Sequence, residues 1–113
     1  MNNKNIKQLT LAYLALILTL SSIPGQSMPP LAILTFDKGI HFIEYGILGV
    51  LVGRYLFSVK RSILLGFIFC AIFGAVDESW QLMIPGRFSS VYDWIADVSG
   101  SITGLIIAFK VHK

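Results

Sequence analysis

Four long apolar segments follow one another along the chain, separated by short polar or proline- and glycine-containing segments. They cover residues 6–23, 39–57, 62–80 and 92–109. A helix that crosses a membrane needs about 20 mostly apolar residues. The last three segments meet this length, and the first does so with Ile6 and a snorkelling Lys7. The pattern predicts an all-α polytopic membrane protein, a bundle of four transmembrane helices that forms a single domain over residues 1–113.

The first apolar segment also fits a different interpretation. Lys4 and Lys7 precede an apolar core, as in a secretory signal peptide. No small-x-small cleavage site follows, because the segment ends in the sequence Ser21-Ser22-Ile23-Pro24-Gly25. We therefore expect this helix to be retained.

Composition agrees with a membrane protein. Of the 113 residues, 55% are hydrophobic and only 13% are charged, against about 25% charged residues in a typical soluble domain. A soluble domain of this size could not bury so much apolar surface. The net charge of +3 comes from scattered basic residues, so we expect no nucleic-acid partner. The single cysteine, Cys70, excludes an intrachain disulfide.

Charged residues divide between the two ends of the predicted bundle. With four spans, seven of the nine basic residues fall on one side, namely Lys4, Lys7, Arg54, Lys60, Arg61, Lys110 and Lys113. The positive-inside rule makes this side, with both termini, cytoplasmic. All six acidic residues fall at the opposite, outer ends of the last three helices. Insertion rules do not explain this second grouping, because acidic residues contribute little to topology.

The outer ends therefore hold the candidate binding site, for which we predict ten residues. They are Asp37, Lys38, His41, Glu44, Asp77, Glu78, Gln81, Arg87, Asp93 and Asp97. Ionisable side chains at membrane depth would face lipid only at a cost of a few kcal/mol each, so we expect them to turn inward. The second and fourth helices begin at this end, and their positive dipole ends favour an anion. The planar guanidinium of Arg87 could hold a carboxylate or phosphate.

Simpler roles exist for some of these residues. Asp37 has the position of an N-cap, and Ser90 and Asp93 have the spacing of a capping box. Capping does not explain Glu44, Asp77, Glu78 or Asp97. A divalent metal is a further alternative, because carboxylates with one histidine suit hard or borderline ions. His41 with a buried carboxylate could also act as an acid–base pair, so catalytic roles stay open.

Glycines recur along two of the predicted helices. Gly39, Gly46 and Gly53 lie on one stripe of the second helix, and Gly100 and Gly104 continue the stripe of Asp93 and Asp97 on the fourth. Stripes of small residues allow membrane helices to approach closely. We expect both stripes to be packing surfaces.

The polar motifs resemble those of the VanZ-like family of bacterial membrane proteins. The matching residues are Asp37-Lys38, His41-Phe42, Glu44-Tyr45, Asp77-Glu78, Gln81, Pro85-Gly86-Arg87, Ser90, Asp93-Trp94, Asp97, Gly100 and Gly104. The family takes its name from an accessory protein of glycopeptide resistance clusters, linked to teicoplanin. The resemblance implies a multi-pass protein of the bacterial cell membrane. It does not imply resistance for this chain, because many family members occur outside such clusters.

Taken together, these features predict a site that binds or processes a cell-envelope ligand at the outer leaflet. Membrane lipids, a lipid-linked cell-wall precursor and a glycopeptide are the candidate partners. A small transporter is one alternative, although the inner halves of the helices are apolar and glycine-rich. A non-catalytic membrane scaffold, in which the polar cluster only fixes helix packing, is the other.

Overall fold

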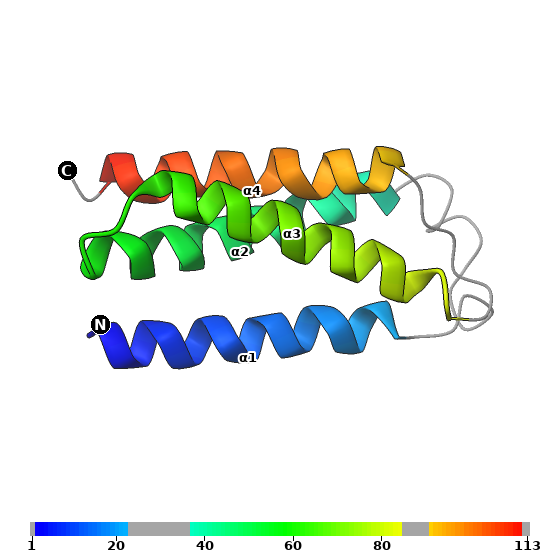
Figure 1. Ribbon diagram of the computed structural model, residues 1–113, viewed down its shortest axis with the longest axis horizontal. Coiled ribbons are helices and arrows are strands. Elements are labelled where there is room, and N and C mark those ends of the chain that lie inside the picture. The colour runs from blue at the N-terminus through cyan, green and yellow to red at the C-terminus, as the bar shows by residue number, and fades with distance from the viewer. Residues whose placement is uncertain (1, 23–36, 85–90, 112–113) are drawn as a thin grey trace.

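The computed structural model describes residues 2–22, 37–84 and 91–111, which form four helices and no strand. The helices are α1 (Asn3–Ser21), α2 (Asp37–Ser58), α3 (Ile63–Gln81) and α4 (Val91–Val111). Successive helices run in opposite directions, so both termini lie at the same end of the bundle (Figure 1). The predicted all-α bundle of four helices is confirmed.

Three of the helices are long and apolar enough to cross a membrane. These are the segments Gly39–Ser58, Ile63–Gln81 and Val91–Val111, of 20, 19 and 21 residues. At 1.5 Å per residue they measure about 30 Å, which is the thickness of a bilayer's hydrocarbon core. Helix α1 does not reach the same hydropathy, since its first two turns contain Lys4, Lys7 and three polar amides.

Helix ends follow from local capping. The side chain of Asn2 accepts a hydrogen bond from the backbone N–H of Asn5, so α1 begins before its apolar residues do. Ser62 caps α3 in the same way through Leu64 N–H. Helix α2 ends in a Schellman motif, in which Arg61 N–H reaches Leu56 O across Lys60, whose φ is 61°.

Helices α2 and α4 form the closest pair. A Cβ atom at Gly100 or Gly104 would overlap the backbone oxygens of Phe42 and Gly46, respectively. The predicted packing role is thus confirmed for Gly46, Gly100 and Gly104, and it also holds for Gly53, where a Cβ would meet Ala108. It is wrong for Gly39, because no heavy atom of the described residues lies within 4 Å of a Cβ built at that position.

The distribution of apolar and polar side chains is the reverse of that in a soluble protein, with apolar side chains outside and polar ones inside. Large apolar side chains such as Ile43, Ile72 and Leu64 are about 60% exposed. Asp77 and Asp97, by contrast, have no exposed surface at all. This arrangement suits a lipid solvent, because lipid favours apolar side chains on the outside and polar groups inside.

Candidate functional site

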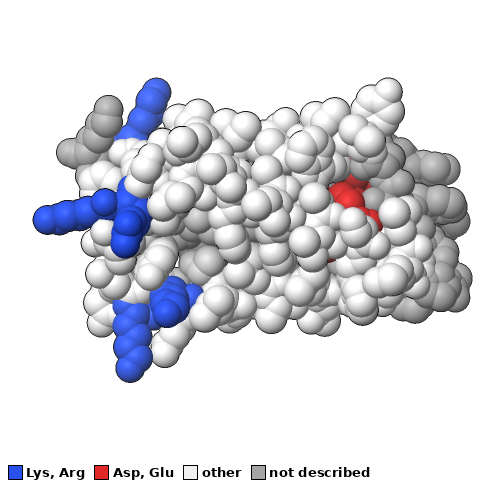
Figure 2. Space-filling view, in the orientation of Figure 1, with Lys and Arg blue, Asp and Glu red and all other residues white. Residues whose placement is uncertain are grey.

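Buried polar side chains gather at one end of the bundle, opposite the termini. Figure 2 shows the acidic residues there and the described Lys and Arg residues at the other end. Helices α2 and α4 begin at this acidic end and α3 ends there (Figure 1). We call the buried set the polar cluster; it consists of His41, Tyr45, Asp77, Glu78, Gln81, Asp93 and Asp97.

The centre of the polar cluster is a set of hydrogen bonds between helices. His41 Nδ1 on α2 lies 2.7 Å from Asp97 Oδ1 on α4 and 3.4 Å from Glu78 Oε2 on α3. Tyr45 Oη, one turn further along α2, donates to Asp77 Oδ2 at 2.7 Å. One imidazole and one phenol of α2 therefore hold carboxylates from both neighbouring helices.

Helix α1 closes the cluster from the fourth side. Gln81 Nε2 donates to Ser21 Oγ at 3.3 Å, and Trp80 Nε1 donates to Ser22 Oγ at 2.8 Å. Further along, Tyr13 Oη donates to the backbone oxygen of Glu44 at 2.7 Å. These contacts, together with the buried Ile17, attach α1 to the rest of the bundle.

Carboxylates outnumber basic groups within the polar cluster. Asp77, Glu78, Asp93 and Asp97 are each at most 6% exposed, and His41 is the basic residue of the cluster. Helix dipoles favour Asp93 in the first turn of α4 but disfavour Asp77 and Glu78 near the end of α3. Such a concentration of buried carboxylates calls for protons or a cation.

Two groups of these residues have metal-ligand geometry. One ligand atom each from Asp77, Glu78 and Asp97 lies within 4.8 Å of the others, and the same holds for His41, Glu78 and Asp93. The first group offers only oxygen and the second adds one nitrogen. Glu78 belongs to both.

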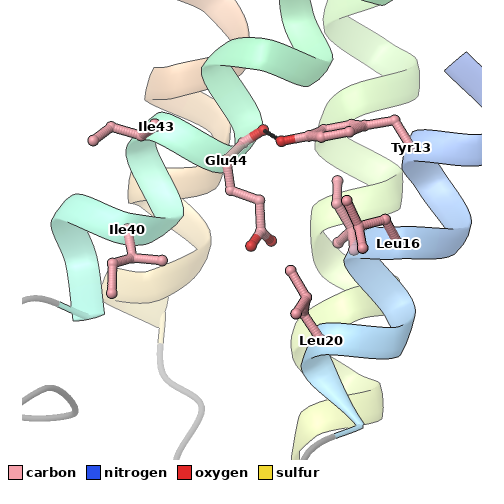
Figure 3. A pocket seen from close by; sticks show the side chains of 7 residues that line it. Tyr13, Leu16, Leu20, Ile40, Ile43 and Glu44 are labelled. Carbon is pink, nitrogen blue, oxygen red and sulfur yellow. Dashed lines mark hydrogen bonds between the residues drawn. The ribbon is translucent and has the colours of Figure 1, made fainter. Parts of the chain in front are cut away.

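An apolar groove runs beside the cluster between α1 and α2 (Figure 3). It encloses about 220 Å³, and Glu44 lies in it among Leu16, Leu20, Ile40 and Ile43. All four of these apolar side chains are 41–64% exposed, so the groove opens to the surroundings of the bundle. The side chain of Glu44 points into this groove in Figure 3.

Of the ten predicted site residues, the structure brings six together in the polar cluster. These are His41, Asp77, Glu78, Gln81, Asp93 and Asp97. Glu44 lines the adjoining groove. Arg87 and the side chains of Asp37 and Lys38 lie outside the described residues, so the predicted anion clamp stays a prediction. Asp93 is buried, and it contributes one ligand atom within 4.8 Å of those of His41 and Glu78.

Sequence reasoning missed the part that Tyr45 and Ser21 take in this end of the bundle. Tyr45 follows His41 by four residues on α2, and this spacing places both on one helix face. This spacing could have identified Tyr45 from the sequence as a neighbour of His41 in the site. Ser21 carries no such signal, because its contact with Gln81 joins residues 60 positions apart.

A scan against protein-family models gives one match, to the VanZ/LLP1 family, over residues 2–112. This chain belongs to the VanZ/LLP1 family. No curated protein and no solved structure matches it. The VanZ/LLP1 match covers all four helices, and the resemblance read from the polar motifs is thereby confirmed. The chain is a membrane protein of this family.

Proposed function

We propose that this VanZ/LLP1 protein binds a cell-envelope lipid or lipid-linked ligand at the outer face of the bacterial cell membrane. The polar head of the ligand would lie at the polar cluster and its apolar part in the groove between α1 and α2. The observation that carries this proposal is the direct adjacency of the two features. Glu44, which lines the groove, precedes Tyr45 of the cluster in the same helical turn.

The polar cluster supports ligand binding because it is more than helix packing requires. Close packing of α2 and α4 already rests on Gly46, Gly100 and Gly104. Carboxylate oxygens of Asp77 and Asp97 and the amide oxygen of Gln81 are buried without a hydrogen-bond partner among the described residues. Buried acceptors in this state carry a free-energy penalty that a bound donor or cation would remove.

Orientation is part of the proposal. All four helices would span the bilayer, with both termini and the basic end in the cytoplasm, as the positive-inside rule requires. The polar cluster then lies at the outer leaflet, where phospholipid head groups, lipid-linked cell-wall precursors and glycopeptides are accessible. Teicoplanin is included among these candidates because of the family resemblance.

Native mass spectrometry of the full chain in detergent tests the proposal. The probes are phosphatidylglycerol, undecaprenyl phosphate and teicoplanin, each added separately. We expect the wild-type protein to retain at least one of them, and Asp77→Asn to retain less. Retention of none of the three by the wild-type protein would contradict the proposed function.

A matched pair of variants tests the groove. Leu16 lines it, whereas Leu9 on the same helix does not, and the two side chains are 47% and 46% exposed. Leu16→Trp fills the groove and is expected to reduce retention of the bound probe, while Leu9→Trp leaves it unchanged. A scaffold without a ligand site predicts the same result for both variants.

A further inference from the structure

Among the described residues, two aspartates of the polar cluster each have one carboxylate oxygen with a hydrogen-bond partner and one without. Asp77 Oδ2 accepts the hydrogen bond of Tyr45, and Asp97 Oδ1 pairs with His41. Asp77 Oδ1 and Asp97 Oδ2 are buried and have no hydrogen-bond partner among the described residues. Because a buried carboxylate oxygen is almost always hydrogen-bonded, two such atoms in one cluster need an explanation.

The position of these aspartates gives that explanation. Asp77, Glu78 and Asp97 bring one ligand atom each to within 4.8 Å of one another. Oxygen ligands around Mg²⁺ or Mn²⁺ lie about 2.1 Å from the ion, so two of them are separated by roughly 3–4 Å. The 4.8 Å limit is slightly larger than this separation, so small side-chain rotations would let the three carboxylates share one ion.

The negative charge of Asp77, Glu78 and Asp97 also favours a bound cation. The three carboxylates are at most 6% exposed and lie near the end of the bundle opposite the termini. Every Lys and Arg whose side chain is described lies at the other end (Figure 2). Carboxylates buried side by side repel one another, and a divalent cation bound between them would offset this repulsion.

The surrounding hydrogen bonds resemble the outer shell of a metal site. Tyr45 and His41 each hold one oxygen of an aspartate at 2.7 Å and thereby fix the direction of the other oxygen. Outer-shell groups of this kind orient the ligands of metal ions. An all-oxygen set suits hard cations rather than thiolate- or imidazole-preferring ones.

We propose that Asp77, Glu78 and Asp97 bind one divalent cation of the Mg²⁺ or Mn²⁺ class, and that Tyr45 and His41 orient two of these ligands. Water or a ligand of the protein would complete the coordination shell. This site goes beyond the proposed lipid binding and does not depend on it.

Titration of the purified full chain with Mn²⁺ in detergent, followed by electron paramagnetic resonance, tests the proposal without any lipid. The wild-type protein is expected to bind one Mn²⁺ saturably, with displacement by excess Mg²⁺. Asp77→Asn and Asp97→Asn each remove the negative charge of a ligand, and should weaken binding at least as much as the loss of an outer-shell group, which costs about tenfold. Ser79→Ala is the control, because Ser79 adjoins Glu78 but is exposed and bonds only its own helix backbone.

Tyr45→Phe tests whether the hydrogen bond that orients the Asp77 carboxylate contributes to cation binding, separately from the carboxylates themselves. It keeps all three carboxylates and removes one hydrogen bond, so Mn²⁺ binding should weaken by roughly tenfold while circular dichroism stays that of the wild-type protein. If an asparagine variant does not fold, Mn²⁺ binding to Tyr45→Phe and Glu78→Gln tests the cation site instead. Absence of saturable binding to the wild-type chain, or wild-type affinity in the folded variants, would overturn the cation site. Lipid retention, measured separately, would be unaffected by that outcome.

Discussion

His41 and Asp97 join α2 to α4 through a buried contact of 2.7 Å between Nδ1 and Oδ1. The two residues are 56 positions apart in the sequence. Glu78 of α3 lies 3.4 Å from the same nitrogen. One imidazole nitrogen of α2 therefore contacts carboxylates of both α3 and α4.

Removing either member of this pair should destabilise the bundle. His41→Ala leaves the Asp97 carboxylate buried without its partner, for which we expect a loss of about 3 kcal/mol in the free energy of unfolding. Asp97→Ala should cost a similar amount, and the double variant less than the sum, with a coupling of about 1–3 kcal/mol. Denaturant titration in detergent with EDTA measures all three.

A second pair of substitutions provides the control for this cycle. Thr103 is exposed on α4, and its hydroxyl bonds Ser99 O on the same helix. His41→Ala and Thr103→Ala should therefore be additive within about 0.5 kcal/mol. Equal coupling in the two cycles would show that the His41–Asp97 contact contributes nothing of its own.

The close approach of α2 and α4 should make one glycine intolerant of a single methyl group. A Cβ at Gly104 would overlap the backbone of Gly46, and backbone cannot move aside as a side chain can. We expect Gly104→Ala to lower the free energy of unfolding by about 1–3 kcal/mol. Thermal unfolding followed by circular dichroism measures the effect.

Gly39→Ala makes the same chemical change where there is room, since nothing lies within 4 Å of that Cβ position. Alanine favours a helix over glycine by about 0.5–1 kcal/mol, so this variant should be slightly more stable than the wild-type protein. A destabilised Gly39→Ala variant would contradict the packing described for this end of α2.

The turn after α2 should gain stability from glycine. Lys60 has a φ of 61° at the C′ position of the Schellman motif, where a side chain is disfavoured by about 1–2 kcal/mol. Lys60→Gly should therefore raise the unfolding free energy by about 1 kcal/mol. Lys60→Ala removes the same charge but keeps the Cβ, and its stability should stay close to that of the wild-type protein.

Membrane orientation can be read by cysteine labelling in a Cys70→Ala background. Cys70 is the only cysteine and is buried. With a membrane-impermeant maleimide on intact cells, Met83→Cys should react from outside, whereas Ser62→Cys and Asn3→Cys should react only after lysis. Reaction of Asn3→Cys from outside, with Ser62→Cys protected, would show that α1 does not span the bilayer.

The sequence by itself determined the helices and the end at which the acidic residues gather. Apolar runs of about 20 residues form helices in lipid because every backbone polar group must be satisfied within the segment. Six of the ten predicted site residues lie in the polar cluster, because ionisable side chains at membrane depth turn away from lipid. The family assignment followed from these same residues.

Only the tertiary structure decided which residues pair. Helical periodicity gives the face of each side chain but not the rotation of one helix against another, which arises from the contact of Gly100 and Gly104 with the backbone of α2. That contact places Asp97 beside His41. Only the structure shows that Gly39, on the same stripe as Gly46 and Gly53, has no heavy atom of the described residues within 4 Å of its Cβ position. The oxygens of Asp77 and Asp97 that have no hydrogen-bond partner among the described residues are recognised only once the helices are assembled.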